Sequence, residues 1–141
     1  MKRFILIFLF IVTLLLIPIS SGSADNMPVP PKESREELYH DMFISLLLPN
    51  INQFIDDYYS KMFTRLPTIY TYMVDITDVK RVNGYRSFSF LVTLEIIPVV
   101  GPHISVGKDR LTYEIGAKAV LFEHEHLETH ELPEHWKHII K

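Results

Sequence analysis

The residues with the clearest capacity for chemistry lie near the C-terminus of this sequence. The run LFEHEHLETHELPEHWKHII, from Leu121 to Ile140, holds five of the seven histidines and five glutamates. If residues 119–127 form a strand, His124 and His126 point to the same face, and His130 can join them from the turn beyond. Imidazoles of this kind bind zinc or copper. One hypothesis is therefore a metal site made of His124, His126 and His130.

Other interpretations of this run stay open. The HELPEH segment has Glu134 where the His-Glu-x-x-His motif of zinc proteases needs its second histidine, so no spacing fixes three ligands. The histidines could instead respond to pH, because imidazole titrates near neutrality, or they could belong to a solvated face. Glu123 and Glu125 share a strand face and could form an acid/base pair of a hydrolase. The chain has no Cys, no Gly-x-Ser-x-Gly motif and no phosphate-binding glycine loop.

A second candidate site lies in the segment from Pro98 to Ile115, PVVGPHISVGKDRLTYEI. The functional interpretation places His103 and Asp109 at one rim of the sheet as ligand contacts. The structural interpretation is turn geometry, with positive φ at Gly101 and Gly107 and a cap from Asp109. The candidate ligand-binding residues are Gly101, Pro102, His103, Gly107 and Asp109.

A long amphipathic helix is expected to begin after Ser34. Ser34 is a suitable N-cap, and Glu37 follows at the position that completes a capping box. Pro49 interrupts the pattern, so we expect a kink or a second helix there. Apolar residues recur at intervals of three and four and predict the buried stripe. These residues are Tyr39, Met42, Phe43, Leu46, Leu47, Ile51, Phe54, Ile55, Tyr58, Tyr59, Met62 and Phe63.

After Pro67 the apolar period changes to two, which predicts strands. Asn83-Gly84 separates the first two of them and predicts a hairpin. We expect a three-residue loop, Val82–Gly84, with a left-handed Gly84 in a bulge, because a one-residue slip would turn an apolar face to solvent. In that register Ile76 faces Phe90, Val74 faces Val92 and Tyr72 faces Leu94.

The rest of the chain predicts further antiparallel strands. A short strand over residues 103–106 and a turn over 107–109 precede strands over 111–115 and 119–127, and Pro133 begins a last helical turn. Helix followed by strands predicts an α+β fold, with the helix, kinked or split at Pro49, packed on a curved antiparallel sheet of four to five strands. Cystatin-like or NTF2-like rolls have a similar order of elements, by analogy only.

The N-terminal residues of the sequence predict export. Lys2 and Arg3 precede an apolar run and a small-residue site, which is typical of a signal peptide over residues 1–24. An uncleaved anchor is the alternative. A proline-rich spacer over 25–33 and a single domain over 34–141 follow. Loss of the signal lowers the net charge from −3 to about −5, which disfavours nucleic acid and anionic membranes as partners.

Four stretches carry a resemblance to a known family. They are SREELYHDMFISLLLP, NGYRSFSFLVTLEI, GPHISVGKDRLTYEI and LPEHWKHII. In this order they resemble the family catalogued as domain of unknown function 3888, small exported proteins of spore-forming Gram-positive bacteria. The resemblance implies a bacterial exported domain and brings no activity or catalytic residue. His103 and His126 stand where the family pattern has a histidine, whereas His124, His130, His135 and His138 look particular to this chain.

These observations predict a secreted, non-enzymatic α+β module without a cofactor. It would be extracellular or associated with the cell wall and bind an unknown protein or cell-surface ligand through the sheet face or the Gly101–Asp109 rim. A partner-binding surface predicts an exposed aromatic patch near Tyr70, Tyr72 and Tyr85. The alternative is a zinc- or copper-binding protein, and a hydrolase is the third hypothesis.

Overall fold

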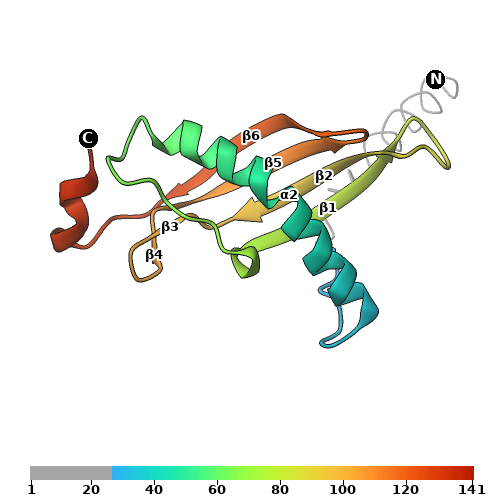
Figure 1. Ribbon diagram of the computed structural model, residues 1–141, viewed down its shortest axis with the longest axis horizontal. Helices are drawn as coiled ribbons and strands as arrows, with labels where there is room; N and C mark the ends of the chain where they lie inside the picture. Colours follow the sequence, from blue (N-terminus) through green and yellow to red (C-terminus); the bar gives the residue numbers. More distant parts are fainter. Residues whose placement is uncertain (1–26) are drawn as a thin grey trace, which may run out of the picture.

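The computed structural model describes residues 27–141, so the predicted signal peptide lies outside the described residues. The helical elements are α2 (Arg35–Tyr59) and the two short 3₁₀ helices η1 (Thr71–Met73) and η2 (Glu134–Ile139). The strands are β1 (Val74–Val82), β2 (Ser89–Ile96), β3 (Val99–Val100), β4 (Ile104–Ser105), β5 (Gly107–Ile115) and β6 (Ala119–Thr129). The α+β prediction is confirmed (Figure 1).

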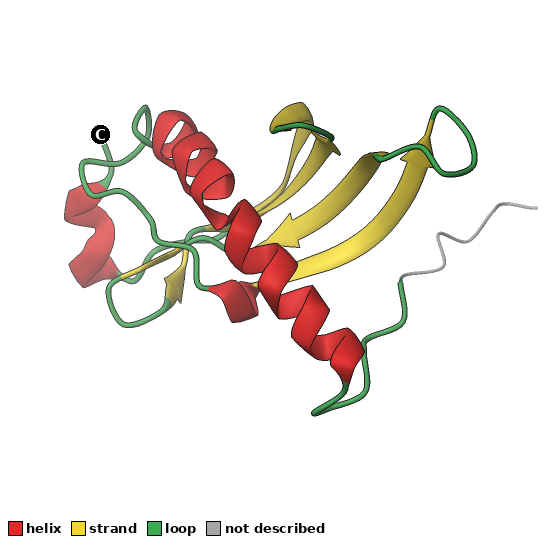
Figure 2. Cartoon of the chain, turned by 45° about the vertical axis from the view of Figure 1, so that its right-hand side comes forward, coloured by secondary structure: helices red, strands yellow, loops and turns green. Residues whose placement is uncertain are grey.

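The main sheet is open, antiparallel and ordered β1-β2-β5-β6, while β3 and β4 form a separate two-stranded sheet between β2 and β5 along the chain. Helix α2 crosses one face of the main sheet diagonally (Figure 2). Within residues 27–141, no helix is long and apolar enough to cross a membrane.

Helix α2 begins as its sequence predicts and continues further than expected. The Ser34 side-chain oxygen accepts a hydrogen bond from the Glu37 N–H at 3.0 Å, which satisfies one of the free donors of the first turn. The Glu37 carboxylate accepts from the N–H of Glu33 rather than that of Ser34. The helix runs through Pro49 as one element, so the split into two helices is wrong.

The buried stripe of α2 is narrower than the apolar pattern and begins later. Its residues are Ile44, Leu47, Ile51, Ile55 and Tyr59, which recur every three or four positions and face the sheet. Tyr39, Met42 and Leu46 were expected in this stripe but are exposed. In the first two and a half turns of α2, Tyr39 and Met42 are therefore exposed, and Phe43 packs partly against the core.

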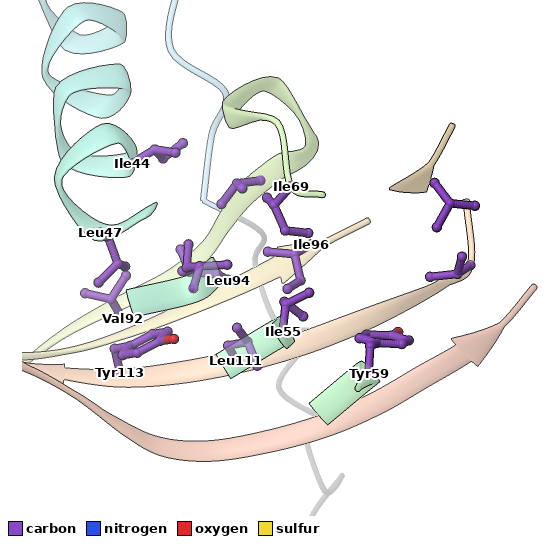
Figure 3. Packing of buried hydrophobic residues seen from close by; sticks show 14 of the residues in the cluster. Ile44, Leu47, Ile55, Tyr59, Ile69, Val92, Leu94, Ile96, Leu111 and Tyr113 are labelled. Carbon is purple, nitrogen blue, oxygen red and sulfur yellow. The ribbon is translucent and has the colours of Figure 1, made fainter. Parts of the chain in front are cut away.

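The buried residues of α2 meet the apolar face of the central strands (Figure 3). Val92, Leu94 and Ile96 of β2 and Leu111 of β5 are fully buried beneath the helix. A fully buried aliphatic side chain stabilises a fold by about 1.5–3 kcal/mol, so this layer contributes several kcal/mol to the stability of the fold.

The predicted register of the β1–β2 hairpin is wrong. Val82 pairs with Ser89, so residues 83–88 form the loop, and Val74 pairs with Ile96 at the other end. Gly84 has the expected positive φ, but Asn83 and Arg86 also adopt left-handed conformations, which lengthens the loop. The bulge lies inside β1, between Ile76 and Asp78, and it lets Ile76 and Val79 both lie on the α2 side of the sheet.

The predicted turn over residues 107–109 is also wrong. Gly107 and Asp109 belong to β5, and Gly107 has no positive φ, whereas Gly101 does at 50°. Residues 107 and 109 are both fully buried on the face covered by α2. Gly107 is suited to this position because a Cβ there would collide with the Glu128 carbonyl oxygen and crowd Tyr59 and His126.

Candidate functional site

The buried carboxylate of Asp109 is the centre of a hydrogen-bond network that joins α2 to β5 and β6. Tyr59 of α2 donates its hydroxyl hydrogen to Asp109 Oδ2 at 2.6 Å. His124 Nε2 and His126 Nδ1 of β6 both contact Asp109 Oδ1, at 2.9 and 2.8 Å. Asp109 has no exposed surface, and a buried carboxylate needs such donors to offset its lost hydration.

Strand geometry brings the two histidines together. Bulges shift the β5–β6 register, so that His126 lies opposite Asp109 and His124 opposite Leu111. Both imidazoles therefore lie on the same face of the sheet, as the strand interpretation predicts, and this face is the one that α2 covers. Phe54 and Tyr58 cover the His124 ring at centroid distances of 4.6 and 4.7 Å.

The tyrosines of this network titrate abnormally. Burial, followed by the hydrogen bond to Asp109, raises the pKa of Tyr59 far above its usual value near 10. Burial and the charge of Asp109 also raise the pKa of Tyr58. Of these two hydroxyls, that of Tyr59 donates to Asp109, and this bond joins α2 to β5.

His130 does not join His124 and His126. Its Nδ1 contacts the Ser105 hydroxyl at 2.7 Å and its Nε2 contacts the Glu128 carboxylate at 3.0 Å. Within residues 27–141, no group of three or more His, Cys, Asp or Glu side chains is arranged to hold a metal ion. The interpretation as a zinc or copper site thus has no preformed three-residue cluster to support it in this part of the chain.

One imidazole has the hydrogen bonds of a general base. His126 is held by Asp109 through Nδ1, and its Nε2 contacts the exposed hydroxyl of Thr129 at 2.8 Å. This carboxylate–imidazole–hydroxyl order is the one used in nucleophilic catalysis. The acid/base pair predicted for Glu123 and Glu125 has no comparable arrangement. Glu125 accepts a hydrogen bond from Arg110 at 2.7 Å and forms an ion pair with it on the sheet face opposite α2.

The residues of the predicted rim fall into two separate places. Gly107 and Asp109 lie in the buried network of β5, whereas Gly101, Pro102 and His103 form the turn between β3 and β4. His103 Nδ1 is 3.3 Å from the Tyr72 hydroxyl, and its ring lies 4.7 Å from that of Tyr70. Tyr72 is exposed, as expected, but Tyr85 is in the hairpin loop at the other end of β1.

Another candidate binding site is an apolar groove that the sequence did not indicate. It lies between the N-terminal part of α2, the half of the main sheet nearest the β1–β2 loop, and the segment Met27–Pro31. Its volume is about 590 Å³. Its lining is almost entirely apolar, with Glu36 and His40 as the polar exceptions. The apolar side chains that form its walls are Tyr39, Phe43, Ile76, Val79, Phe90, Val92 and Ile115.

The groove exists because α2 covers only part of the apolar sheet face. The helix crosses the sheet and leaves the strand ends near the turns without a helical cover (Figure 2). Val79 is consequently 43% exposed, although it lies opposite the buried Val92. The apolar alternation of β2 and β5 was visible in the sequence, but nothing in it indicated which half of the face α2 would cover.

The proline-rich stretch predicted as a spacer forms one wall of this groove. Met27 donates its N–H to the Thr77 carbonyl oxygen at 3.3 Å, the one backbone hydrogen bond that joins described residues 27–30 to the sheet. Val29 is 90% exposed. This wall is therefore weakly fixed compared with the strands opposite.

Comparison with known proteins gives one match. No curated protein and no solved structure matches the chain, so the analogy with cystatin-like and NTF2-like rolls receives no support from the comparison. The model of a family described as "Protein of unknown function (DUF3888)" matches residues 39–128. This match begins inside α2, ends near the end of β6 and includes Tyr59, Asp109, His124 and His126. The chain therefore belongs to the DUF3888 family.

Proposed function

We propose that this protein is a non-enzymatic binding module that acts outside the cell and holds a single-chain amphiphile, such as a fatty acid or lysolipid, in the apolar groove. The observation that carries the proposal is the groove itself, whose volume of about 590 Å³ and apolar lining are typical of sites for small apolar ligands. Export of the chain is part of the proposal and rests on the sequence of residues 1–24.

The distribution of polar groups favours an amphiphile over a purely apolar ligand. Glu36 and His40 lie on the helix side of the groove. At the strand ends, the Arg81 guanidinium lies 4.8 Å from the centroid of the Phe90 ring, which lines the groove. An apolar chain along Val79, Phe90 and Ile115 would thus end near a cation, which suits an anionic headgroup.

The weakly fixed Met27–Pro31 wall supports a site that opens. If a ligand chain displaced the segment Met27–Pro31, one backbone hydrogen bond between the described residues would break, that from Met27 to Thr77. A ligand chain would in return cover apolar side chains such as Val79 that the fold leaves partly exposed.

The test is titration of the chain beginning at Asp25 with a fluorescent fatty acid. The helix, both sheets and every described buried residue lie within residues 35–141, so this chain keeps the fold. Val79→Asp places a charge against the ligand chain and should weaken binding at least about tenfold. Val120→Asp is the matched control, because Val120 is also on an edge strand, is 46% exposed and does not line the groove.

A second pair of variants tests the helix side. Tyr39→Ser should weaken binding several-fold because Tyr39 lines the groove, while Leu46→Ser, also exposed on α2 but outside the groove, should bind like the parent. Equal binding by Val79→Asp and Val120→Asp, or absence of fatty-acid and lysolipid binding by the parent chain, would show that the groove is not such a site. Binding of an extended apolar peptide alone would assign the groove to a protein partner.

A further inference from the structure

We infer that the turn end of the main sheet docks this protein on an anionic lipid bilayer. The turn end consists of residues 83–88 between β1 and β2 and residues 116–118 between β5 and β6. Antiparallel pairing of Phe90 with Ile115, and of Ile115 with Ala119, places both turns at the same end of the sheet, as Figure 1 shows. This inference goes beyond the proposed groove function and does not require an occupied groove.

Two large aromatic side chains project from the longer turn. Tyr85 is 94% exposed and Phe88 is 82% exposed. Left-handed backbone at Asn83, Gly84 and Arg86 shapes this loop. Exposed aromatic side chains of this kind are typical of segments that enter the interface of a bilayer.

The charge around these aromatics is positive, although the whole chain is acidic. The turn end and the adjoining strand residues carry four cations, namely Lys80, Arg81, Arg86 and Lys118, and two carboxylates, Asp78 and Glu114. Asp78 is paired with Lys80 at 2.6 Å. Each Lys or Arg near an anionic surface strengthens binding by about fivefold. The expectation of no membrane partner followed from the net charge, which conceals this local excess.

The turn end lies next to the groove, so docking on a bilayer would bring the groove close to lipid. Phe90 and Ile115 line the groove, pair with each other and lie one or two residues from the two turns. A bilayer in contact with Tyr85 and Phe88 would therefore lie close to the end of the groove where Arg81 is found. A single-chain amphiphile could pass between bilayer and groove over a short distance.

The experiment is co-sedimentation of the chain beginning at Asp25 with vesicles of phosphatidylcholine and phosphatidylglycerol in a ratio of about 3:1. Parent protein should sediment with these vesicles and stay in solution with pure phosphatidylcholine. The double substitution Tyr85→Ser and Phe88→Ser should lower the partition coefficient at least about tenfold, and Arg86→Gln should lower it about fivefold.

Tyr72→Ser is the matched control, because Tyr72 is 66% exposed but precedes the opposite end of β1; it should bind like the parent. Tyr39→Ser in the groove should also dock normally, which separates docking from ligand binding. A Phe88→Trp probe in a Trp136→Phe background should show a blue-shifted emission on the anionic vesicles alone. Equal sedimentation with both vesicle types, equal binding by the control and the double variant, or an unshifted probe would each overturn the inference.

Discussion

Two buried tyrosines offer a test of the structure in which one chemical change should have opposite effects. Tyr59 and Tyr113 are 1% and 2% exposed. The Tyr59 hydroxyl donates to the Asp109 carboxylate at 2.6 Å. The Tyr113 hydroxyl is buried and has no hydrogen-bond partner among residues 27–141. Replacement of either residue by Phe removes a single oxygen and keeps the ring.

The expected magnitudes follow from these partners. A hydrogen bond to a charged group contributes about 1.5–3 kcal/mol, so Tyr59→Phe should lower the free energy of unfolding by about 2 kcal/mol. An unsatisfied buried hydroxyl costs about 1–3 kcal/mol, so its removal in Tyr113→Phe should raise the free energy of unfolding by about 1 kcal/mol. For a chain of this size 1 kcal/mol corresponds to roughly 4 °C in Tm.

Thermal and urea unfolding of the chain beginning at Asp25 measure both effects. Tyr59→Phe should melt about 8 °C below the parent and Tyr113→Phe about 4 °C above it. The urea m-values should be unchanged if both variants keep the native fold. Equal destabilisation by the two substitutions would refute the reasoning, because the hydroxyl of Tyr113 would then have a partner comparable to Asp109.

Three further results are expected. Gly101→Ala should lower the free energy of unfolding by about 2 kcal/mol, because a Cβ at this positive φ would collide with the ring of Trp136. The fluorescence of Trp136, the one tryptophan, should change as well. Gly116→Ala, with open space around it, should leave the stability unchanged. Hydrogen bonds from Lys108 and then Arg110 lower the pKa of Glu95. The stabilisation by the Glu95 carboxylate is therefore present above its unfolded pKa near 4.5 and is lost as pH falls below that value. Glu95→Gln should lower the free energy of unfolding by about 1 kcal/mol at pH 7, and the stabilities of variant and parent should become equal in acid. Burial raises the pKa of Tyr113 to about 12, so parent stability should fall by about 1.4 kcal/mol per pH unit from its unfolded pKa near 10 towards pH 12, and melts of Tyr113→Phe should lack that component.

Local signals in the sequence account for the elements that were predicted correctly. Ser34 caps α2 because its hydroxyl can reach an N–H three residues ahead, and this contact needs no knowledge of the tertiary fold. The alternation along β2 likewise identifies Val92, Leu94 and Ile96 as buried. Periodicity and capping depend on near neighbours, so they can be predicted from sequence alone.

The predictions failed where the structure depends on contacts between distant residues or on a choice between two possible turn conformations. The Asn83-Gly84 pair predicted a tight hairpin, but the left-handed Arg86 and the bulge inside β1 accompany a longer loop. Ile76 therefore lies opposite Leu94 and not opposite Phe90. Asp109 was assigned to a turn because it follows Gly107 and because Asp commonly caps turns. Its burial in β5 depends on Tyr59, which is fifty residues away, and on two histidines of β6.

The two ends of α2 have different relations to the sheet, and this difference favours the groove as a binding site rather than a packing defect. Towards its C-terminus, buried residues from Ile44 to Tyr59 and the bond to Asp109 fix the helix. Residues 35–43 contribute only the partly buried Phe43 to the core, and apolar side chains such as Tyr39 remain exposed. Val79 and Phe90 line the groove beside these turns, and Val79 is 43% exposed. Because the N-terminal turns leave that surface open, a helix firmly anchored at one end can provide a stable wall for a ligand at the other.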